Sequence, residues 1–545
     1  MCRKRVSGIF VGHLSLLVLL AGFGTLPAAG QASVTTYHND NYRTGWNANE
    51  TVLTPAKVAG NTFGLLHTVP LDDQVDAQPL VVPNVMITTG GFKGLHNVVY
   101  VATEGNTVYG IGQNSGNIFV KTNLGPPVPT PLGCQNNGPN VGINSTPVID
   151  ASTNTLYVIA YTQDAGGPAY RIHALDLGNL TDKVAPVLIT ASHTLTDGTT
   201  YNFNAKYQRQ RPGLLLANGN IYAGFGSFCD FSPGLSRGWL LGWTTNTLTP
   251  LGTNQLFDTQ ATSPKSFFLS SIWMSGYAPS TDDAGNVLFV TGNSDPSGTT
   301  YDGVTNLQES VVKLSPTLTT VVDLFTPSNQ ASLEATDGDF GSGGVLVLPD
   351  QPGALPHLAV AAGKFGNLYL MNEDQLGGYS TTKNNVLGTY SIGGCWCGQS
   401  YFVDPVDGLA RVVTSAGRKA KVWKLATSPT PSLTLTKTSP MLTGGQDPGF
   451  FTTVSSNGKT HPIVWALSRA VTTPPNFPIY LYAFDPEATG DAMTQLFMSV
   501  AGTWPSVNGN ANLVPTVANG AVFVATYKQL QIFGIKPPAG TKVED

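Results

Sequence analysis

Short apolar runs recur along the chain in a fixed order, and each is bounded by Gly, Asn, Asp or Pro. One run leads through a turn to a second that ends near Val-Tyr-Val, and another turn leads to a third that ends near Ala-Leu-Asp. Runs of this kind, rich in β-branched and aromatic residues, are typical of β-strands. Almost no stretch longer than about a dozen residues shows helical apolar spacing, which argues against helical and α/β folds.

The repeated phrase occurs eight times. Its copies begin near Gln78, Thr146, Arg211, Ser275, Gly343, Ser400, Phe450 and Val514. The starts lie roughly fifty to seventy residues apart, which suits a four-stranded blade with long insertions. We therefore predict an all-β fold, an eight-bladed β-propeller of four-stranded antiparallel blades.

Composition agrees with one large β-structure. Charged residues make up 11% of the chain, against about 25% in a typical soluble domain. The 61 glycines and 38 prolines fit many tight turns between strands. No low-complexity linker interrupts the repeats, so we expect a single domain over residues 33–545.

The sequence leaves two alternatives for ring closure. Residues 36–55 would supply a strand that pairs with the last blade, which would otherwise expose an edge. Alternatively, residues 530–533 close the ring by themselves and residues 37–46 pack beneath it. Either way, residues 33–70 form an N-terminal segment that packs on the ring or closes it.

The first residues have the three-part layout of a secretory signal peptide. A basic start at Arg3-Lys4-Arg5 precedes an apolar stretch over residues 9–20 and a small-residue segment that ends at Ala32. A membrane anchor is the alternative, but the apolar stretch is short for a bilayer. We predict a signal peptide over residues 1–32, a secreted or periplasmic location, and no integral membrane segment after its removal.

The mature chain keeps four cysteines, Cys134, Cys229, Cys395 and Cys397, which allow three disulfide pairings in an oxidising compartment. Cys134 and Cys229 flank neighbouring blades, so a bridge between those blades is one candidate. Cys395 and Cys397 would then close a small strained ring with a redox role; a structural turn or a bridge to another blade are the alternatives. No metal site is predicted, because no Cys or His pair shows zinc-ligand spacing.

Five segments carry a family resemblance: residues 37–45 (YHNDNYRTG), 142–150 (GINSTPVID), 210–216 (QRPGLLL), 225–230 (FGSFCD) and 339–344 (DFGSGG). Through them the chain resembles the quinoprotein alcohol dehydrogenase-like superfamily of pyrroloquinoline quinone (PQQ) repeat propellers. It is especially similar to exported bacterial proteins of unassigned activity. The resemblance covers nearly the whole mature chain and implies the propeller fold.

For the enzymes of this superfamily, the resemblance implies PQQ held near the ring axis between a Trp and a bridge of adjacent cysteines. It also implies Ca²⁺ bound by Glu, Asn and Asp, with a further Asp as base. This chain has no adjacent Cys-Cys pair, since Trp396 separates Cys395 from Cys397. PQQ with Ca²⁺ is therefore an alternative, and no cofactor is assigned.

Candidate ligand residues lie where the chain leads into each innermost strand, at the mouth of the central channel. They are Gln78, Asn144, Arg211, Trp273, Asp339, Gln399 and either Asn510 or Asn512. Arg211 would pair with a carboxylate, the amides would orient the ligand, and Trp273 would stack on a ring, as for a sugar or a quinone carboxylate. Alternatively, these groups satisfy one another and order water.

Asp339 is the candidate catalytic residue, as a general base beside a Gly-rich turn; a capped turn is the alternative. Standard signatures of esterases, zinc proteases and nucleotide hydrolases are missing. The net charge of -5 and the lack of a basic run argue against nucleic acid. We therefore expect an exported monomer that binds a small polar molecule or a protein partner at the channel mouth. The alternative is a PQQ-dependent dehydrogenase of alcohols or sugars with a divergent site.

Overall fold

The computed structural model describes residue 1 and residues 31–538, apart from residues 135–137, 230–235, 253–254, 263–267, 296–297, 445–447, 472–475 and 507–511. Most of the predicted signal peptide, residues 2–30, lies outside the described residues, so its removal stays a prediction. Among the described helices, none combines the length and apolar character needed to cross a bilayer.

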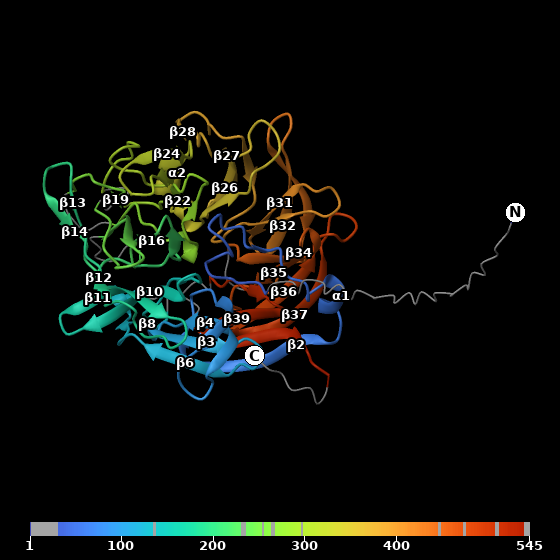
Figure 1. The fold of residues 1–545 in the computed structure, drawn as a ribbon. Helices are drawn as coiled ribbons and strands as arrows, with labels where there is room; N and C mark the ends of the chain where they lie inside the picture. The colour runs from blue at the N-terminus through green and yellow to red at the C-terminus, as the bar shows by residue number, and fades with distance from the viewer. Residues whose placement is uncertain are drawn as a thin grey trace. The chain divides into compact units, whose positions relative to one another are not determined.

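Residues 31–538 form eight small sheets around one centre (Figure 1). The first sheet, or blade, is β3 (Leu80–Ile87), β4 (Gly94–Ala102), β5 (Thr107–Gly112) and β6 (Ile118–Asn123). The second is β9 (Val148–Asp150), β10 (Thr155–Asp164), β11 (Gly167–Asp176) and β12 (Val187–Leu188). The third is β15 (Leu215–Ala217), β16 (Asn220–Phe225), β18 (Trp239–Thr244) and β19 (Gln255–Leu256). The fourth is β21 (Ser280–Thr281), β22 (Val287–Val290), β23 (Val311–Leu314) and β24 (Val321–Thr326), extended by β28 (Gly378–Tyr379).

The remaining blades continue in chain order. The fifth is β25 (Val345–Leu348), β26 (Leu358–Ala362), β27 (Asn367–Asn372) and β29 (Gly388–Ser391). The sixth is β30 (Ser400–Val403), β31 (Ala410–Ala416), β32 (Lys419–Ala426) and β33 (Ser432–Thr438). The seventh is β1 (Trp46–Asn47), β34 (Thr452–Asn457), β35 (Thr460–Leu467), β36 (Pro478–Asp485) and β37 (Thr494–Thr503). The eighth is β38 (Thr516–Ala518), β39 (Ala521–Ile535) and β2 (Phe63–Gln74). The predicted eight-bladed β-propeller is confirmed.

Short elements decorate the blades. Two helices are α1 (Pro55–Val58) and α2 (Gln330–Ala335), and 3-10 turns are η1 (Pro131–Gly133), η2 (Met274–Gly276) and η3 (Phe340–Ser342). Small strand pairs are β7 (Val128–Pro129) with β8 (Asn140–Val141), β13 (Ser192–Thr194) with β14 (Thr200–Asn202), and β17 (Ser236–Arg237) with β20 (Phe268–Leu269). These insertions explain why the repeat spacing exceeds the length of a minimal blade.

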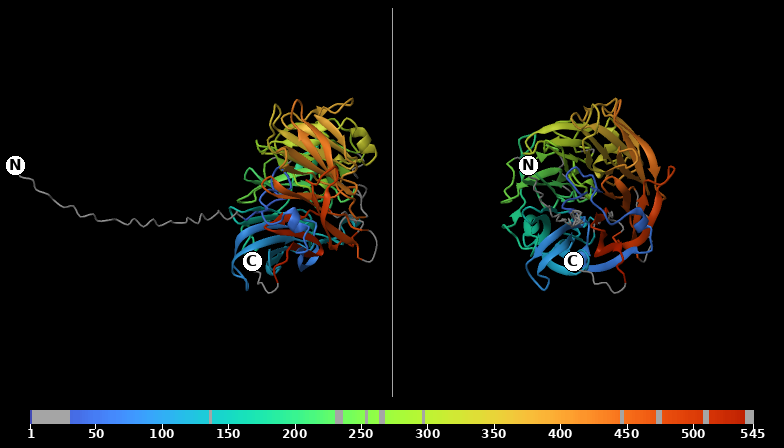
Figure 2. Two further views of the ribbon diagram at one scale, coloured as in Figure 1. Left: turned by 90° about the vertical axis from the view of Figure 1, so that its right-hand side faces the viewer. Right: turned by 45° about the vertical axis from the view of Figure 1, so that its right-hand side comes forward.

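The middle strands are apolar on both faces because each blade packs between two others. All five residues of β26 are buried. Leu215 of the third blade, Val287 of the fourth and Val345 of the fifth belong to one core cluster. A blade would leave these faces exposed to water if it stood alone, so the stability of each depends on its neighbours. The right-hand view in Figure 2 shows the sheets arranged around the centre.

The ring closes through a strand from each end of the described chain. In the eighth blade β2 pairs with β39 in antiparallel register, from Phe63 opposite Ile535 to Gln74 opposite Tyr527. β2 begins later than the 36–55 segment considered from sequence. Main-chain hydrogen bonds therefore join the early and late parts of the propeller and leave no open edge between them.

Residues 34–47, here called the N-terminal strap, run inside the ring and contact the innermost strands of all eight blades in order (Figures 1 and 2). The main-chain N–H groups of Val81, Ile149, Thr281, Val347, Tyr401 and Val454 each donate to a strap carbonyl at 2.7–3.0 Å. In the third and eighth blades, the side chains of Asn41 and Asn47 donate instead to the carbonyls of Leu216 and Val517, both at 2.9 Å. The strap thus satisfies inner strand edges that would otherwise face an open channel.

Aromatic packing holds the strap at the centre. His38 stacks on Tyr37, with ring centroids 4.8 Å apart, and Tyr277 contacts both rings edge-on at 5.1 Å. The buried guanidinium of Arg43 donates to the carbonyls of Tyr37 and Pro279, at 2.9 and 2.8 Å. These residues occupy the middle of the ring, so the centre is a packed core at this level.

A disulfide joins Cys134 and Cys229, with Cα atoms 5.9 Å apart and a separation of 95 positions in sequence. Cys134 precedes the second blade and Cys229 lies in the third. A second disulfide joins Cys395 and Cys397, whose Cα atoms are 5.0 Å apart. Of the pairings left open by the sequence, the structure contains the bridge between neighbouring blades together with the local ring.

Candidate ligand-binding site

Polar and aromatic side chains gather where the chain leads into the innermost strands and where the second and third strands of a blade turn. Antiparallel pairing brings these two places to the same end of a blade. We call this set the axial cluster; it comprises Glu104, Asn144, Arg209, Arg211, Trp273, Glu309, Asp339, Lys364, Trp396, Arg469 and Asn512.

Glu104, Asn144 and Arg209 form one side of the axial cluster. Asn144 donates to Glu104 Oε1 at 2.5 Å and accepts from Arg209 Nε at 3.0 Å. The main-chain N–H of Gly142 donates to Glu104 Oε2 at 2.7 Å. Burial and the nearby Asp76 carboxylate raise the pKa of Glu104 well above its ordinary value. Burial and Asp76 therefore make the charged form of Glu104 less favourable than in water.

Arg211 is buried but incompletely hydrogen-bonded. Only 4% of it is exposed, and its Nη2 has no hydrogen-bond partner in the described part of the structure. Its guanidinium lies over the Trp273 ring, 5.9 Å from the centroid. Burial, and then the charge of Arg209, lowers its pKa well below the ordinary value. The Asp76 carboxylate acts on Arg211 with the opposite sign, and Arg469 again lowers its pKa, so three arginines and an acidic side chain meet here.

Trp273 and the buried Glu309 belong to another part of the cluster. Its indole edge faces Gly292, where a Cβ atom would lie 2.9 Å from Trp273 Nε1. Glu309 is fully buried, and its Oε2 accepts from the main-chain N–H of Phe340 at 2.6 Å. Burial and the charges of Asp339 and Glu334 raise the pKa of Glu309 well above its ordinary value. Glu309 is thus also favoured in its protonated form.

Asp339 is buried and paired with a cation. Lys364 Nζ lies 3.2 Å from Asp339 Oδ2 and 2.5 Å from Asp337 Oδ2. Burial lowers the pKa of Lys364, but the two carboxylates outweigh burial and raise it overall. Lys364 therefore stays charged beside Asp339. The predicted role of Asp339 as a general base stays a prediction.

Trp396 lies between two cations at the edge of the cluster. Lys364 Nζ and the guanidinium of Arg469 are 5.7 and 5.9 Å from its ring centroid. Arg469 also donates to the Trp396 carbonyl at 2.5 Å and to Asn512 Oδ1. Cation–π contacts of this kind fix an aromatic ring while leaving its indole N–H to other partners.

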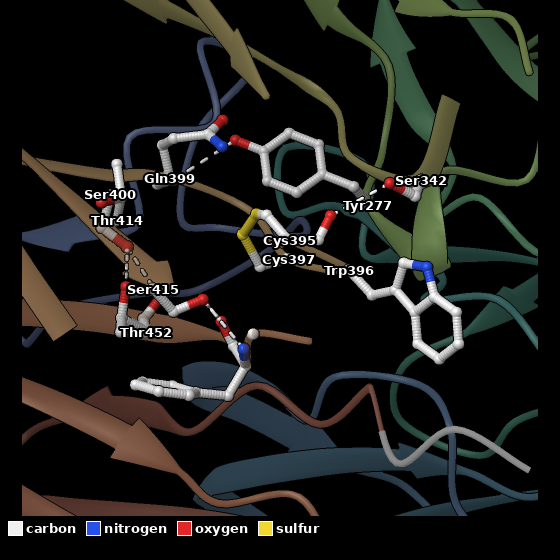
Figure 3. The surroundings of a disulfide bond; sticks show 12 residues. Tyr277, Ser342, Cys395, Trp396, Cys397, Gln399, Ser400, Thr414, Ser415 and Thr452 are labelled. Carbon is white, nitrogen blue, oxygen red and sulfur yellow. Dashed lines mark hydrogen bonds between the residues drawn. A yellow bond between two sulfur atoms is a disulfide. The ribbon is translucent and has the colours of Figure 1, made fainter. Parts of the chain in front are cut away.

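The Cys395–Cys397 disulfide flanks Trp396 in sequence, and the Trp396 side chain points away from it (Figure 3). Both cysteines have no exposed surface. Ser342 donates to the Cys395 carbonyl at 3.0 Å, which ties the turn to the fifth blade. A buried disulfide is closed to direct attack by a solvent thiol, so the geometry favours the structural turn over the redox role.

Two predicted ligand residues face the strap. Gln78 accepts from the main-chain N–H of His38 at 3.0 Å. Gln399 has no exposed surface, and its main-chain carbonyl accepts from the Tyr277 hydroxyl at 3.5 Å. The structure therefore brings Asn144, Arg211, Trp273 and Asp339 into the axial cluster, while Gln78 and Gln399 lie against the packed centre. Asn512 is in the cluster, and Asn510 lies outside the described residues.

Sequence reasoning missed the residues at the turns between second and third strands. Glu104 follows Ala102-Thr103 and Lys364 follows Gly363, each directly after the apolar second strand of its blade. Both strand ends could have been assigned to the same rim as the lead-in residues, because the strands are antiparallel. Arg469 occupies a comparable place after β35.

Among the described residues of the cluster named below, more buried donors than acceptors lack a hydrogen-bond partner. Nitrogen atoms without a partner are Arg211 Nη2, Trp273 Nε1, Trp396 Nε1 and Asn512 Nδ2, and Glu309 Oε1 is an unpaired oxygen. Each buried polar group left unpaired costs about 1–3 kcal/mol. A ligand rich in acceptor atoms would offset this cost.

Comparison with solved structures supports the fold. A quinohemoprotein alcohol dehydrogenase from Pseudomonas putida is similar with a TM-score of 0.57 at 12% identity, over 94% of this chain and 82% of the other. A europium-containing methanol dehydrogenase gives a TM-score of 0.48 at 10% identity, over 91% and 83% of the two chains. BamB from Moraxella catarrhalis gives 0.45 at 12% identity, over 87% and 99%. Similarity at these identities establishes the propeller architecture alone.

Sequence comparison adds no family assignment, since no family model and no curated protein sequence matches the chain. The comparisons therefore show the β-propeller fold of the chain.

Proposed function

We propose that this protein is an exported propeller that binds a small, acceptor-rich anion at the axial cluster. The observation that carries the proposal is the buried guanidinium of Arg211, whose Nη2 has no hydrogen-bond partner among the described residues. Buried arginines are normally paired, and their planar fork matches a carboxylate or phosphate.

The charge of the cluster supports an anion. The charges of Arg209 and Arg469 act on Arg211 and outnumber the nearby Asp76 carboxylate, whereas burial raises the pKa values of Glu104 and Glu309. The indole N–H groups of Trp273 and Trp396 are further donors. A small molecule with several oxygen acceptors and a flat part beside Trp273 meets these requirements.

A PQQ-dependent dehydrogenase is the second candidate function. The axial cluster has groups that could bind PQQ, but other features of such a site are not seen. Arg211, Trp273 and Trp396 would offer donors to the carboxylate and quinone oxygens of PQQ. Among the described residues, no group of three or more His, Cys, Asp or Glu side chains is placed to hold a metal ion. The buried Cys395–Cys397 ring also lacks the exposed sulfur surface that would cover a cofactor.

Thermal unfolding with a panel of ligands tests the proposal. We would add inorganic phosphate, citrate, glucose, and PQQ with and without Ca²⁺ to the mature protein, at matched ionic strength. An anion present at a hundred times its Kd should stabilise the fold by about 2.7 kcal/mol. Glucose should have no effect, and a calcium requirement would favour the dehydrogenase.

The Arg211→Met variant gives the specific control, with Arg171→Met beside it. Arg171 is part-exposed on β11 and paired with Asp164 at 2.6 Å, away from the cluster. Stabilisation by the anion should disappear in Arg211→Met and persist in Arg171→Met. Absence of any anion effect beyond that of sodium chloride would overturn the proposal.

A further inference from the structure

The folded propeller begins at Ala32, which a single asparagine holds from two sides. The Ala32 N–H donates to Asn519 Oδ1 at 2.7 Å, and Asn519 Nδ2 donates to the Ala32 carbonyl at 3.0 Å. Asn519 Nδ2 also donates to Gln113 Oε1 at 3.1 Å, which links the contact to the first blade. Ala32 is 7% exposed, whereas Gln31 is exposed.

This contact anchors the start of the N-terminal strap. Two residues later, Val34 is fully buried and exchanges two main-chain hydrogen bonds with Val81, both at 2.8 Å. Cleavage after Ala32 would remove both hydrogen bonds between Asn519 and Ala32 and leave the Asn519 side chain with only its contact to Gln113. Cleavage one or more residues earlier would leave every one of these contacts in place.

The sequence offers a suitable earlier position. Ala28 and Gly30 stand three residues and one residue before the bond between Gly30 and Gln31. Small residues at those two places are the pattern of a signal-peptide cleavage site. Gln31 would then be the first residue of the mature chain, and its exposed position leaves its α-amine and side chain free to react.

We propose that cleavage after Gly30 makes Gln31 the N-terminal residue and that Gln31 then cyclises to pyroglutamate; this rests on the export included in the proposed function. The α-amine nitrogen attacks Cδ of the Gln31 side chain and forms a five-membered lactam. The bond between Cδ and Nε2 breaks, the α-amine gives up a proton to the departing nitrogen, and ammonia leaves. The step is a ring-closing acyl transfer and needs neither oxidant nor reductant.

The product protects the strap. A lactam has no α-amine, so an aminopeptidase that requires a free amine cannot begin to remove residues from this end. Ala32 keeps its amide N–H for Asn519, because the preceding peptide bond is intact. The N-terminal strap would therefore be preceded by a blocked N-terminus and anchored at Ala32.

Mass spectrometry of the N-terminal peptide tests the inference on the full chain, expressed in a secreting bacterium and collected from outside the cytoplasm. The expected peptide begins at Gln31 and is lighter by one ammonia, and pyroglutamyl aminopeptidase should expose Ala32. In the Gln31→Ala variant the same cleavage should leave a free α-amine. A peptide that begins at Ser33, or one that begins at Gln31 with its amine free, would overturn the inference.

Two further outcomes separate this inference from the proposed function. A chain that keeps Met1 and stays in the cytoplasm would overturn export itself, whatever the axial cluster binds. An exported chain that begins at Ser33 but still binds the anion would overturn only the processing inference. The Asn519→Ala variant supplies a second readout, since it should lower the unfolding midpoint more in a chain that keeps Ala32 than in a chain that begins at Ser33, where only the contact to Gln113 is lost.

Discussion

Arg211 is a buried cation whose surroundings stabilise it poorly. Trp273 covers one face of the guanidinium, and Arg209 and Arg469 add charge of the same sign, which the Asp76 and Glu104 carboxylates offset only in part. Burying a charge without full pairing is costly. Such a residue lowers the free energy of unfolding, so its retention is easier to explain by binding than by stability.

The Arg211→Met variant should therefore be more stable than the wild type without ligand, by about 1–3 kcal/mol, since Met fills similar space without charge. Urea unfolding measures this difference. Arg171→Met, at a part-exposed site, should change the free energy of unfolding by less than about 0.5 kcal/mol. A destabilised Arg211→Met protein would show that the guanidinium has a structural partner.

The buried His38 of the strap should make the stability of the protein depend on pH. Burial lowers its pKa from 6.5 to about 3, and Arg43 lies close by. The folded protein therefore holds His38 neutral, while the unfolded chain takes up a proton below pH 6.5. Stability from this group is fully present above pH 6.5 and is lost as the pH falls toward 3, by about 2.7 kcal/mol at pH 4.5.

Urea unfolding of His38→Phe at pH 7 and pH 4.5 measures this dependence. The wild type should lose more stability than the variant between the two values. His357→Phe is the comparison, because His357 is exposed and hydrogen bonding to Asp374 raises its pKa. An equal loss in the wild type and His38→Phe would contradict a neutral buried His38.

At the scale of elements, the strap depends on glycines that admit Tyr277. A Cβ at Gly398 would lie 2.1 Å from Tyr277 Cε2, and one at Gly344 would lie 1.9 Å from Tyr277 Cδ1. Tyr277 in turn packs edge-on against Tyr37 and His38 of the strap. The inner strands of the fifth and sixth blades can therefore lie close to the strap only because these two positions lack side chains.

Gly398→Ala should lower the free energy of unfolding by about 3 kcal/mol, because the ring of Tyr277 is enclosed and cannot move aside. Gly91→Ala is the matched control, since a Cβ at Gly91 meets nothing within 4 Å. Thermal or urea unfolding compares the two. Equal stability of both variants would show that the centre of the ring is loosely packed.

The two disulfides should differ in their effect on stability. Cys134 and Cys229 close a loop of 95 residues, whereas Cys395 and Cys397 are separated by one residue. Loop-closure entropy grows with loop length, so Cys134→Ala with Cys229→Ala should cost about 4 kcal/mol. The Cys395→Ala and Cys397→Ala double variant should lose less free energy of unfolding. Urea unfolding measures both double variants, and a larger loss in the Cys395–Cys397 variant would contradict the prediction.

For the whole molecule, the repeats made the propeller predictable, because each strand run is local and bounded by turn residues. The position of the N-terminal strap was not predictable, since its partners are strands of eight blades spread over the whole chain. Its Asn-rich sequence also lacks the alternation of apolar and polar residues that marks a strand. The same reason explains why Gln78 was assigned to the mouth, although it contacts His38. Arg211 and Trp273, which the sequence places on one rim, lie 5.9 Å apart from guanidinium to ring centroid because they lead into adjacent blades.

The central claim is that Arg211 binds an anion at the axial cluster. A crystal structure of the mature protein with the most stabilising anion of the thermal panel tests it most directly. We predict an acceptor atom of the anion within hydrogen-bond distance of Arg211 Nη2, beside Trp273. A guanidinium fully paired by protein groups, with the anion bound elsewhere, would contradict the account.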